Sequence, residues 1–213
     1  MGNHTQAEKT NRGFFSERFI KTFRGLFLPI SRGLVRAGFT PNMVTFISLV
    51  LGMLTGVLLG LNMIYIGLAL GIIMSFSDLI DGQMAKEFGG ASKFGGVLDS
   101  TVDRLNEFFI FAGFAVRYYF LGRPEWMIFC AFAFLGSVMI SYIRARAEAA
   151  GLDCKVGFLQ RPERLVIMGI FILFGSIGID VILVFMAFAT QVTVITRLLH
   201  VYRQGRKDEK KIV

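Results

Sequence analysis

Residues 78–103 read DLIDGQMAKEFGGASKFGGVLDSTVD, and both the fold and the function we predict start from this stretch. It holds four aspartates at or near the ends of two apolar segments, namely Asp78, Asp81, Asp99 and Asp103. On helices, spacings of three and four residues put each pair of carboxylates on one face, about one turn apart. An ionised Asp in a membrane span costs about 2.5 to 3.5 kcal/mol on insertion scales. A helix cap or the membrane interface explains one such residue, whereas all four predict oxygen ligands for Mg²⁺ or Mn²⁺.

The composition indicates an all-α integral membrane protein without a separate soluble domain. The chain has 213 residues, of which 54% are hydrophobic, and its mean hydropathy is +0.61. Several segments reach about 20 apolar residues, the length that an α-helix needs to span a bilayer. The net charge of +8 comes from basic residues beside these segments, so we expect contacts with the membrane surface and a phosphorylated substrate rather than nucleic acid. Cys130 and Cys154 lie in an apolar segment and a basic loop, so no disulfide is expected.

The N-terminal part is expected to lie on the membrane. Residues 1–11 form a polar tail without the apolar region of a signal peptide. In residues 12–38, apolar and basic side chains alternate at roughly helical spacing, which predicts an amphipathic helix in the membrane interface. The alternative is a poorly packed leader. Pro29 is expected to break or kink this helix.

Residues 39–203 are expected to form one membrane domain of six transmembrane helices, followed by a basic tail at 204–213. Thr40 suits the N-cap of the first helix and Pro41 its first position. Gly52, Gly56 and Gly60 share one face of that helix, which indicates close helix packing rather than a ligand site. A turn is expected at 175–180, before the last span. The six spans are expected at about 41–61, 63–81, 95–121, 126–149, 164–174 and 181–202.

The distribution of charge predicts the orientation. All of the 23 Lys and Arg residues except Arg104, Arg117 and Arg123 lie in the terminal regions, in the loop after the second span, or between the fourth and fifth spans. By the positive-inside rule, both termini and the Asp-rich stretch are expected on the cytoplasmic side of the plasma membrane. The other halves of the spans are almost wholly apolar. This disfavours a divalent-cation transporter, whose ion path needs polar residues as far as both faces.

The fixed residues of the central stretch resemble the signature of the CDP-alcohol phosphatidyltransferase family. They read Asp78-x2-Asp81-Gly82-x2-Ala85-Lys86-x8-Gly95-x3-Asp99-x3-Asp103. Every fixed position matches except position 86, where the family has Arg. The resemblance implies six spans, with this motif joining the second and third, and a homodimer. It also implies that Asp78, Asp81, Asp99 and Asp103 are metal ligands and that Asp103 is the general base on the acceptor hydroxyl.

The chemistry of such an enzyme accounts for the pattern. A CDP-activated lipid carries a diphosphate, and two divalent ions about 3.5 to 4 Å apart can hold its attacking and leaving oxygens. Small residues at Gly82, Ala85 and Gly95 let the nucleotide approach the backbone. Lys86 offsets phosphate charge as a point charge, without the bidentate fork of Arg. The resemblance places further nucleotide contacts in the segment PNMVT at 41–45, where Asn42 stands in place of Asp. The residues expected to bind the CDP-lipid are Asn42, Thr45, Asp78, Gly82, Ala85, Lys86 and Gly95.

A second group of residues is expected to bind the phosphate of the acceptor. The runs SYIRARAE at 141–148 and RPER at 161–164 resemble those of the phosphatidylinositol phosphate synthase branch, which uses inositol 1-phosphate. Arg144 stands where that branch has Lys. Clustered Arg at helix ends is typical of a phosphate site, although basic residues there also serve topology. The expected acceptor residues are Ser141, Arg144, Arg146, Arg164 and Arg197.

Several alternatives remain at this point. CDP-diacylglycerol and CDP-archaeol fit the donor motif equally, because the aspartates concern the diphosphate and not the lipid tails. The acceptor is alternatively glycerol 3-phosphate, serine or an aminoalcohol. Glu107, one turn beyond Asp103, is expected to pair with Arg104 or another basic group rather than to act in catalysis.

Overall fold

The computed structural model describes the backbone of residues 17–212 apart from 90, 155 and 158–160, and this part of the chain is helical without a strand. The all-α fold is therefore confirmed. The elements, in order, are α1 Glu17–Arg36, α2 Pro41–Gly60, α3 Ile64–Glu87, α4 Lys93–Phe120, the 3-10 turn η1 Pro124–Trp126, α5 Met127–Ala149, α6 Arg161–Ile172 and α7 Gly175–Ile212.

Side-chain caps fix where α2 and α4 begin. Thr40 precedes α2 in an extended conformation, and its hydroxyl accepts a hydrogen bond from the backbone N–H of Met43, as predicted. Ser92 does the same for α4, accepting from the N–H of Gly95 at 2.9 Å. These two caps start the helices that carry the polar residues described below.

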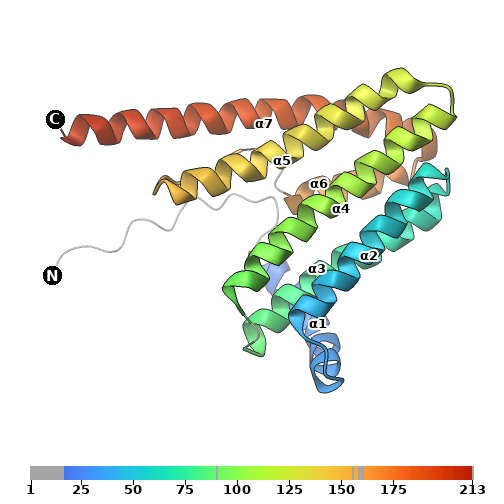
Figure 1. Cartoon of the computed structure of the whole chain (residues 1–213), viewed down its shortest axis with the longest axis horizontal. Coiled ribbons are helices and arrows are strands. Elements are labelled where there is room, and N and C mark those ends of the chain that lie inside the picture. The colour runs from blue at the N-terminus through green and yellow to red at the C-terminus, as the bar shows by residue number, and fades with distance from the viewer. Residues whose placement is uncertain (1–16, 90, 155, 158–160, 213) are drawn as a thin grey trace.

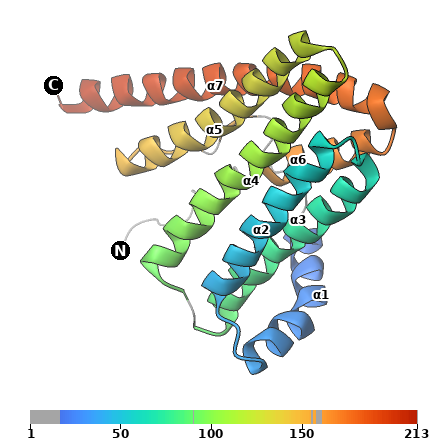
Figure 2. The same ribbon diagram turned by 45° about the vertical axis from the view of Figure 1, so that its right-hand side comes forward.

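The helices form two groups that meet along α4. Helix α2 packs against α3 and α4, α5 packs against α7, and α4 also contacts α5. The short α6 lies against α7 and α3. Figures 1 and 2 show α2, α3 and α4 side by side, with α5 and α7 running together beyond them to one side. A buried apolar cluster fills the interior, including Leu59, Met74, Phe114, Ile182 and Met186.

Helices α2 and α4 approach each other at glycines, as the spacing on α2 predicts. A Cβ atom added at Gly56 would lie 2.4 Å from the carbonyl oxygen of Phe109. A Cβ atom at Gly113 would lie 2.3 Å from the carbonyl oxygen of Gly56. Gly52 faces α4 in the same way, through Asn106. The prediction of close packing is confirmed, because these positions leave no room for a side chain between the two backbones.

Four helical segments of the described chain are long and apolar enough to cross a membrane. They are Pro41–Gly60, Ile64–Glu87, Pro124–Ala149 and Gly175–Arg206. Helix α4 has 28 residues but a charged first half, and α6 has only 12 residues, about 18 Å. A bilayer core is about 30 Å thick, so α6 alone is too short to span it. The chain is a membrane protein with four candidate spans, and the count of six stays a prediction.

Two boundaries in the C-terminal half differ from the sequence-based expectation. The turn expected at 175–180 lies earlier, at 173–174, and Gly175 opens α7 with a positive φ of 66° that favours glycine. The segment expected as a separate basic tail at 204–213 continues α7 as far as Ile212. Its Lys, Arg and Glu residues are good helix formers, which explains why the helix does not stop where the apolar sequence stops.

The described residues test only part of what is expected for the N-terminal segment. Residues 1–16, which include the expected polar tail, lie outside the described part of the chain. Helix α1 lies within the segment expected to be amphipathic and continues through Pro29, so the helix does not break there, and a kink stays a prediction. Phe27 is buried against Phe76 of α3, with ring centroids 5.0 Å apart. This packing holds the helix together where proline removes one backbone hydrogen bond.

The end of the bundle away from the aspartates holds a polar cluster that the sequence did not predict. Arg117 is 2% exposed, and its guanidinium donates to Asn62 Oδ1 and Ser176 Oγ, both at 2.8 Å. Arg123 forms an ion pair with Asp180 at 2.9 Å. These contacts tie the turns after α2, α4 and α6 together. The apolar cluster lies between them and the aspartates, so the two polar ends are separate.

Candidate active site

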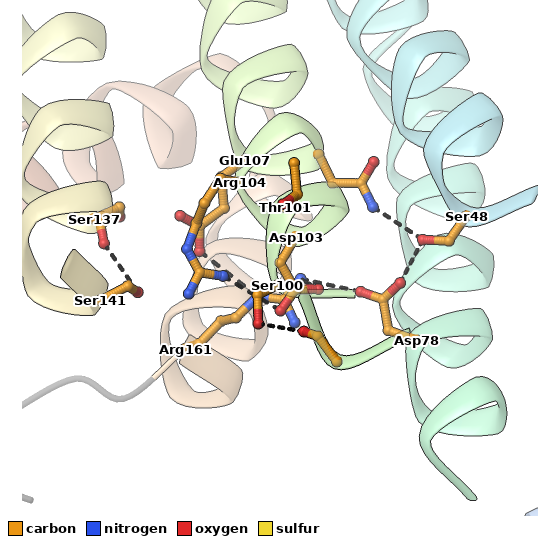
Figure 3. Close-up of polar contacts among 12 residues, drawn as sticks. Ser48, Asp78, Ser100, Thr101, Asp103, Arg104, Glu107, Ser137, Ser141 and Arg161 are labelled. Carbon is orange, nitrogen blue, oxygen red and sulfur yellow. Dashed lines mark hydrogen bonds and ion pairs between the residues drawn. The ribbon is translucent and has the colours of Figure 1, made fainter. Parts of the chain in front are cut away.

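The end of α3 and the start of α2 bring the first two aspartates together with hydroxyl groups. Thr45 Oγ1 donates a hydrogen bond to Asp81 Oδ2 at 2.5 Å. Ser48 Oγ, one turn further along α2, donates to Asp78 Oδ1 and accepts from the side-chain N–H of Asn106 at 2.9 Å (Figure 3). Both hydroxyls therefore orient carboxylates of α3, and Asn106 connects Ser48 to α4.

Arg161, the first residue of α6, bridges the carboxylates of α3 and α4. Its Nη2 lies 2.7 Å from Asp103 Oδ1 and 3.0 Å from Asp78 Oδ2 (Figure 3). Its Nε lies 3.8 Å from Glu107 Oε1. One guanidinium thus neutralises charge from three carboxylates that are 10%, 12% and 5% exposed. The arrangement lowers the cost of burying these acidic groups together.

A second arginine of α6 enters the same cluster from the next turn. Arg164 Nη2 lies 2.9 Å from Glu107 Oε1, and both side chains are 5% exposed. The expectation that Glu107 pairs with a basic group is confirmed, and a partner is Arg164. Arg104 instead lies 3.4 Å from Asp103.

The four aspartates offer the type of ligand that a hard divalent ion needs. Arg161 lies between two of their carboxylates. Asp78, Asp81, Asp99 and Asp103 offer only oxygen ligands, the type that Mg²⁺ and Mn²⁺ prefer. Asp81 Oδ1 is buried without a hydrogen-bond partner, so this carboxylate oxygen is available to a bound ion. Within the described residues, no three acidic, His or Cys side chains are arranged to enclose an ion. In this conformation Arg161 offsets the charge of Asp78 and Asp103.

The residues expected to contact the nucleotide lie around this cluster. Asn42, at the start of α2, faces the start of α4, where a Cβ atom added at Gly95 would lie 3.0 Å from Asn42 Oδ1. Gly82 directly follows Asp81 on α3, and a Cβ atom there would meet nothing within 4 Å. Ala85 is half-buried, and Lys86 is exposed in the last turn of α3. The surface beside the aspartates is therefore open at Gly82 and basic at Lys86.

Of the residues expected to bind the acceptor phosphate, some are buried and others are exposed. Arg164 lies in the carboxylate cluster, as described. Ser141 is half-buried on α5, with its Oγ 3.5 Å from the carbonyl oxygen of Ser137. Arg144 forms an exposed ion pair with Glu148 at 2.8 Å, and Arg146 is exposed in the last turn of α5. Arg144 and Arg146 are therefore solvated on the surface of α5, whereas Arg164 is buried.

Arg197 holds the segment after α5 against α7. Its Nε donates to the carbonyl oxygen of Val156 at 2.9 Å, and its Nη1 donates to that of Ile140 at 2.5 Å. Cys154 is buried beside this contact, and burial raises the pKa of its thiol, so the thiol stays neutral. Cys130 and Cys154 are both free, as expected. In this conformation Arg197 is a structural link rather than an exposed anion-binding group.

Sequence reasoning missed Ser48 and Asn106, and it included Arg161 in the RPER run without placing it among the carboxylates. A usable signal was present for each, because each lies one helical turn from an expected site residue. Ser48 follows Thr45 by three, Asn106 follows Asp103 by three, and Arg161 precedes Arg164 by three. On an apolar helix, a polar residue one turn from a motif residue indicates a member of the same site.

The part of the chain that holds the cluster matches a known protein family. The family model "CDP-alcohol phosphatidyltransferase" matches residues 39–198, which include α2 to α6 and most of α7. The chain belongs to the CDP-alcohol phosphatidyltransferase family. Transferases of this family depend on a metal ion, which agrees with the oxygen-only donor set of the four aspartates.

Several family members of known name or structure resemble this phosphatidyltransferase. A phosphatidylinositol phosphate synthase of Mycobacterium tuberculosis is 39% identical over 151 residues, 68% of each chain. An archaetidylinositol phosphate synthase of Pyrococcus horikoshii is 37% identical over 79% of this chain and 87% of its own. Crystal structures of the mycobacterial synthase, one with CDP-DAG bound and one with manganese and citrate, have TM-scores of 0.73 and 0.75. Both are 34% identical and cover 82% of this chain, and this chain covers 92% and 88% of them respectively.

Proposed function

We propose that the protein transfers a phosphatidyl group from CDP-diacylglycerol to inositol 1-phosphate and releases CMP. The observation that carries this proposal is the meeting of the motif with the arginines of α6: Arg161 pairs with Asp78 and Asp103, and Arg164 pairs with Glu107. Carboxylates suit the metal-bound diphosphate of the donor, and Arg suits the phosphate of the acceptor. Inositol 1-phosphate is favoured over glycerol 3-phosphate because the named relatives are inositol phosphate enzymes.

Asp78, Asp81, Asp99 and Asp103 would hold two divalent ions, Mg²⁺ or Mn²⁺. Such ions neutralise the diphosphate and polarise the phosphorus that is attacked. Thr45 and Ser48 orient the carboxylates of α3 through their hydrogen bonds. Asn42, Thr45, Gly82, Ala85, Lys86 and Gly95 would border the cytidine and diphosphate, with CDP-archaeol as the alternative donor.

The transfer itself needs a base and a phosphate site. Asp103 accepts the proton of the acceptor hydroxyl, whose oxygen attacks the lipid-side phosphorus while the bond to CMP breaks. Arg164 is a buried member of the acceptor site, and Glu107 positions it through their 2.9 Å ion pair. Ser141, Arg144, Arg146 and Arg197 complete the proposed site, with Arg197 changing its present contacts to do so.

The proposed setting is the plasma membrane, with six spans in α2 to α7, α1 in the interface, and the aspartates and both termini cytoplasmic. The positive-inside distribution of Lys and Arg supports this orientation. A homodimer is proposed from the resemblance to the family. The apolar cluster between the two polar ends supports an enzyme open to one side rather than a cation transporter.

A panel of acceptors tests the function. Purified protein is incubated with CDP-diacylglycerol and Mg²⁺, and CMP release is measured with inositol 1-phosphate, inositol, glycerol 3-phosphate or serine. We expect release that depends on inositol 1-phosphate. Release with glycerol 3-phosphate alone would overturn the acceptor assignment while keeping the reaction class, and CDP-archaeol in place of CDP-diacylglycerol compares the donors.

Removal of metal is expected to stop this reaction. Because the diphosphate is neutralised by divalent ions, dialysis against EDTA should reduce CMP release to background, and Mg²⁺ or Mn²⁺ should restore it. Excess Ca²⁺ is the control, since its larger radius and looser coordination suit the site poorly. Full activity in EDTA would contradict the metal role of the four aspartates.

A further inference from the structure

Arg161 occupies the position that a metal ion would need. Its Nη2 is within 3.0 Å of oxygens from both Asp78 and Asp103, and its side chain is only 24% exposed. A Mg²⁺ ion held by Asp78 and Asp103 would need carboxylate oxygens at about 2.0 to 2.1 Å, which are the groups that Arg161 contacts. The guanidinium and the ion cannot share that space, and their like charges repel each other.

We propose that Arg161 and the divalent ion compete for the carboxylates of Asp78 and Asp103. Arg161 is thus a positioning residue: it holds the two carboxylates together in the metal-free protein and leaves them when the ion binds. The inference rests on the proposed function, because it takes these two aspartates as metal ligands.

The structure offers Arg161 a second position. Glu107 Oε2 is buried without a hydrogen-bond partner, and the Nε of Arg161, 3.8 Å from Glu107 Oε1, is equally unsatisfied. A small rotation of the guanidinium toward Glu107 would satisfy both groups. The ion therefore displaces Arg161 without leaving a buried charge unpaired, which would otherwise oppose metal binding.

Arg161→Gln tests the competition. Mn²⁺ binding to the purified protein in detergent is measured by electron paramagnetic resonance, which reports the free ion. We expect Arg161→Gln to bind Mn²⁺ about tenfold more tightly than the natural protein, a change of about 1.4 kcal/mol. In EDTA the same variant should unfold at a lower temperature, since its carboxylates then repel each other, and Mn²⁺ should raise its Tm more than that of the natural protein.

Two further variants separate the possible outcomes. Arg206→Gln makes the same charge change at an exposed position near the end of α7, and it should leave both the Mn²⁺ affinity and the Tm unchanged. Arg161→Lys keeps a cation without the fork of Arg, and its Mn²⁺ affinity should fall between those of the natural protein and Arg161→Gln. Equal or weaker Mn²⁺ binding by Arg161→Gln would overturn the competition. Absence of Mn²⁺ binding by the natural protein would instead overturn the proposed metal site.

Discussion

Replacing Asp103 with Asn is expected to slow CMP release by at least about 10² to 10⁴-fold, the usual contribution of a general base. Asn has nearly the same shape but cannot accept the proton of the acceptor hydroxyl, and its amide is a weaker metal ligand than a carboxylate. Asp103 is 8% exposed and in contact with Arg161, so water has little access to replace it. Binding of CDP-diacylglycerol should stay measurable, because the other three aspartates and the residues around Gly82 remain.

Two measurements distinguish the base from the metal ligand. If Asp103→Asn binds Mn²⁺ with nearly natural affinity and still turns over slowly, the lost function is proton transfer. If Mn²⁺ affinity falls in parallel with the rate, Asp103 acts chiefly as a ligand. Asp153→Asn makes the same chemical change in an exposed loop and should keep the natural rate. Retained activity in Asp103→Asn would refute both roles.

The polar residues of the site were predictable where their signal is local. The spacing of Asp78 and Asp81, and that of Asp99 and Asp103, places each pair on one helix face whatever the helices pack against. The cap at Thr40 depends on a few neighbouring residues, and it was predicted correctly.

The partners of these residues were not predictable, because tertiary packing decides them. Arg161 meets Asp78 across 83 residues of sequence, and Ser48 meets Asp78 across 30. From the sequence pattern alone, a basic residue beside a membrane span fits three roles equally well: positive-inside topology, a phosphate site or a buried ion pair. Packing makes Arg164 and Arg197 buried while Arg144 and Arg146 stay exposed.

Helix ends in the C-terminal half show a similar limit. The apolar pattern locates membrane-compatible segments, but α7 extends beyond its apolar part to Ile212 because helix propensity continues there. Conversely, α4 spans the bundle although its first half is charged, since Asp103 and Asn106 face polar groups of α6 and α2. A prediction from hydropathy alone therefore ends α7 too early and underestimates how far α4 extends through the bundle.

Replacing Gly56 with Ala is expected to destabilise the protein by about 1 to 3 kcal/mol, the usual effect of overpacking a tight contact. The added Cβ would lie 2.4 Å from the carbonyl oxygen of Phe109, which is backbone and cannot rotate away. Helices α2 and α4 would have to separate. Since α2 carries Thr45 and Ser48, which orient the aspartates, CMP release should fall together with the Tm.

A graded series of glycine variants, followed by thermal unfolding in detergent, makes this argument specific. A Cβ at Gly60 would lie 3.2 Å from the side chain of Val116, which can rotate, so Gly60→Ala should lower the Tm less than Gly56→Ala. A Cβ at Gly205 in α7 meets nothing within 4 Å, so Gly205→Ala should keep or raise the Tm. The higher helix propensity of Ala adds up to about 1 kcal/mol to the free energy of unfolding. The opposite order would mean that backbone contact between α2 and α4 does not limit stability. Equal activity in all three variants would show that the position of α2 does not control the aspartates.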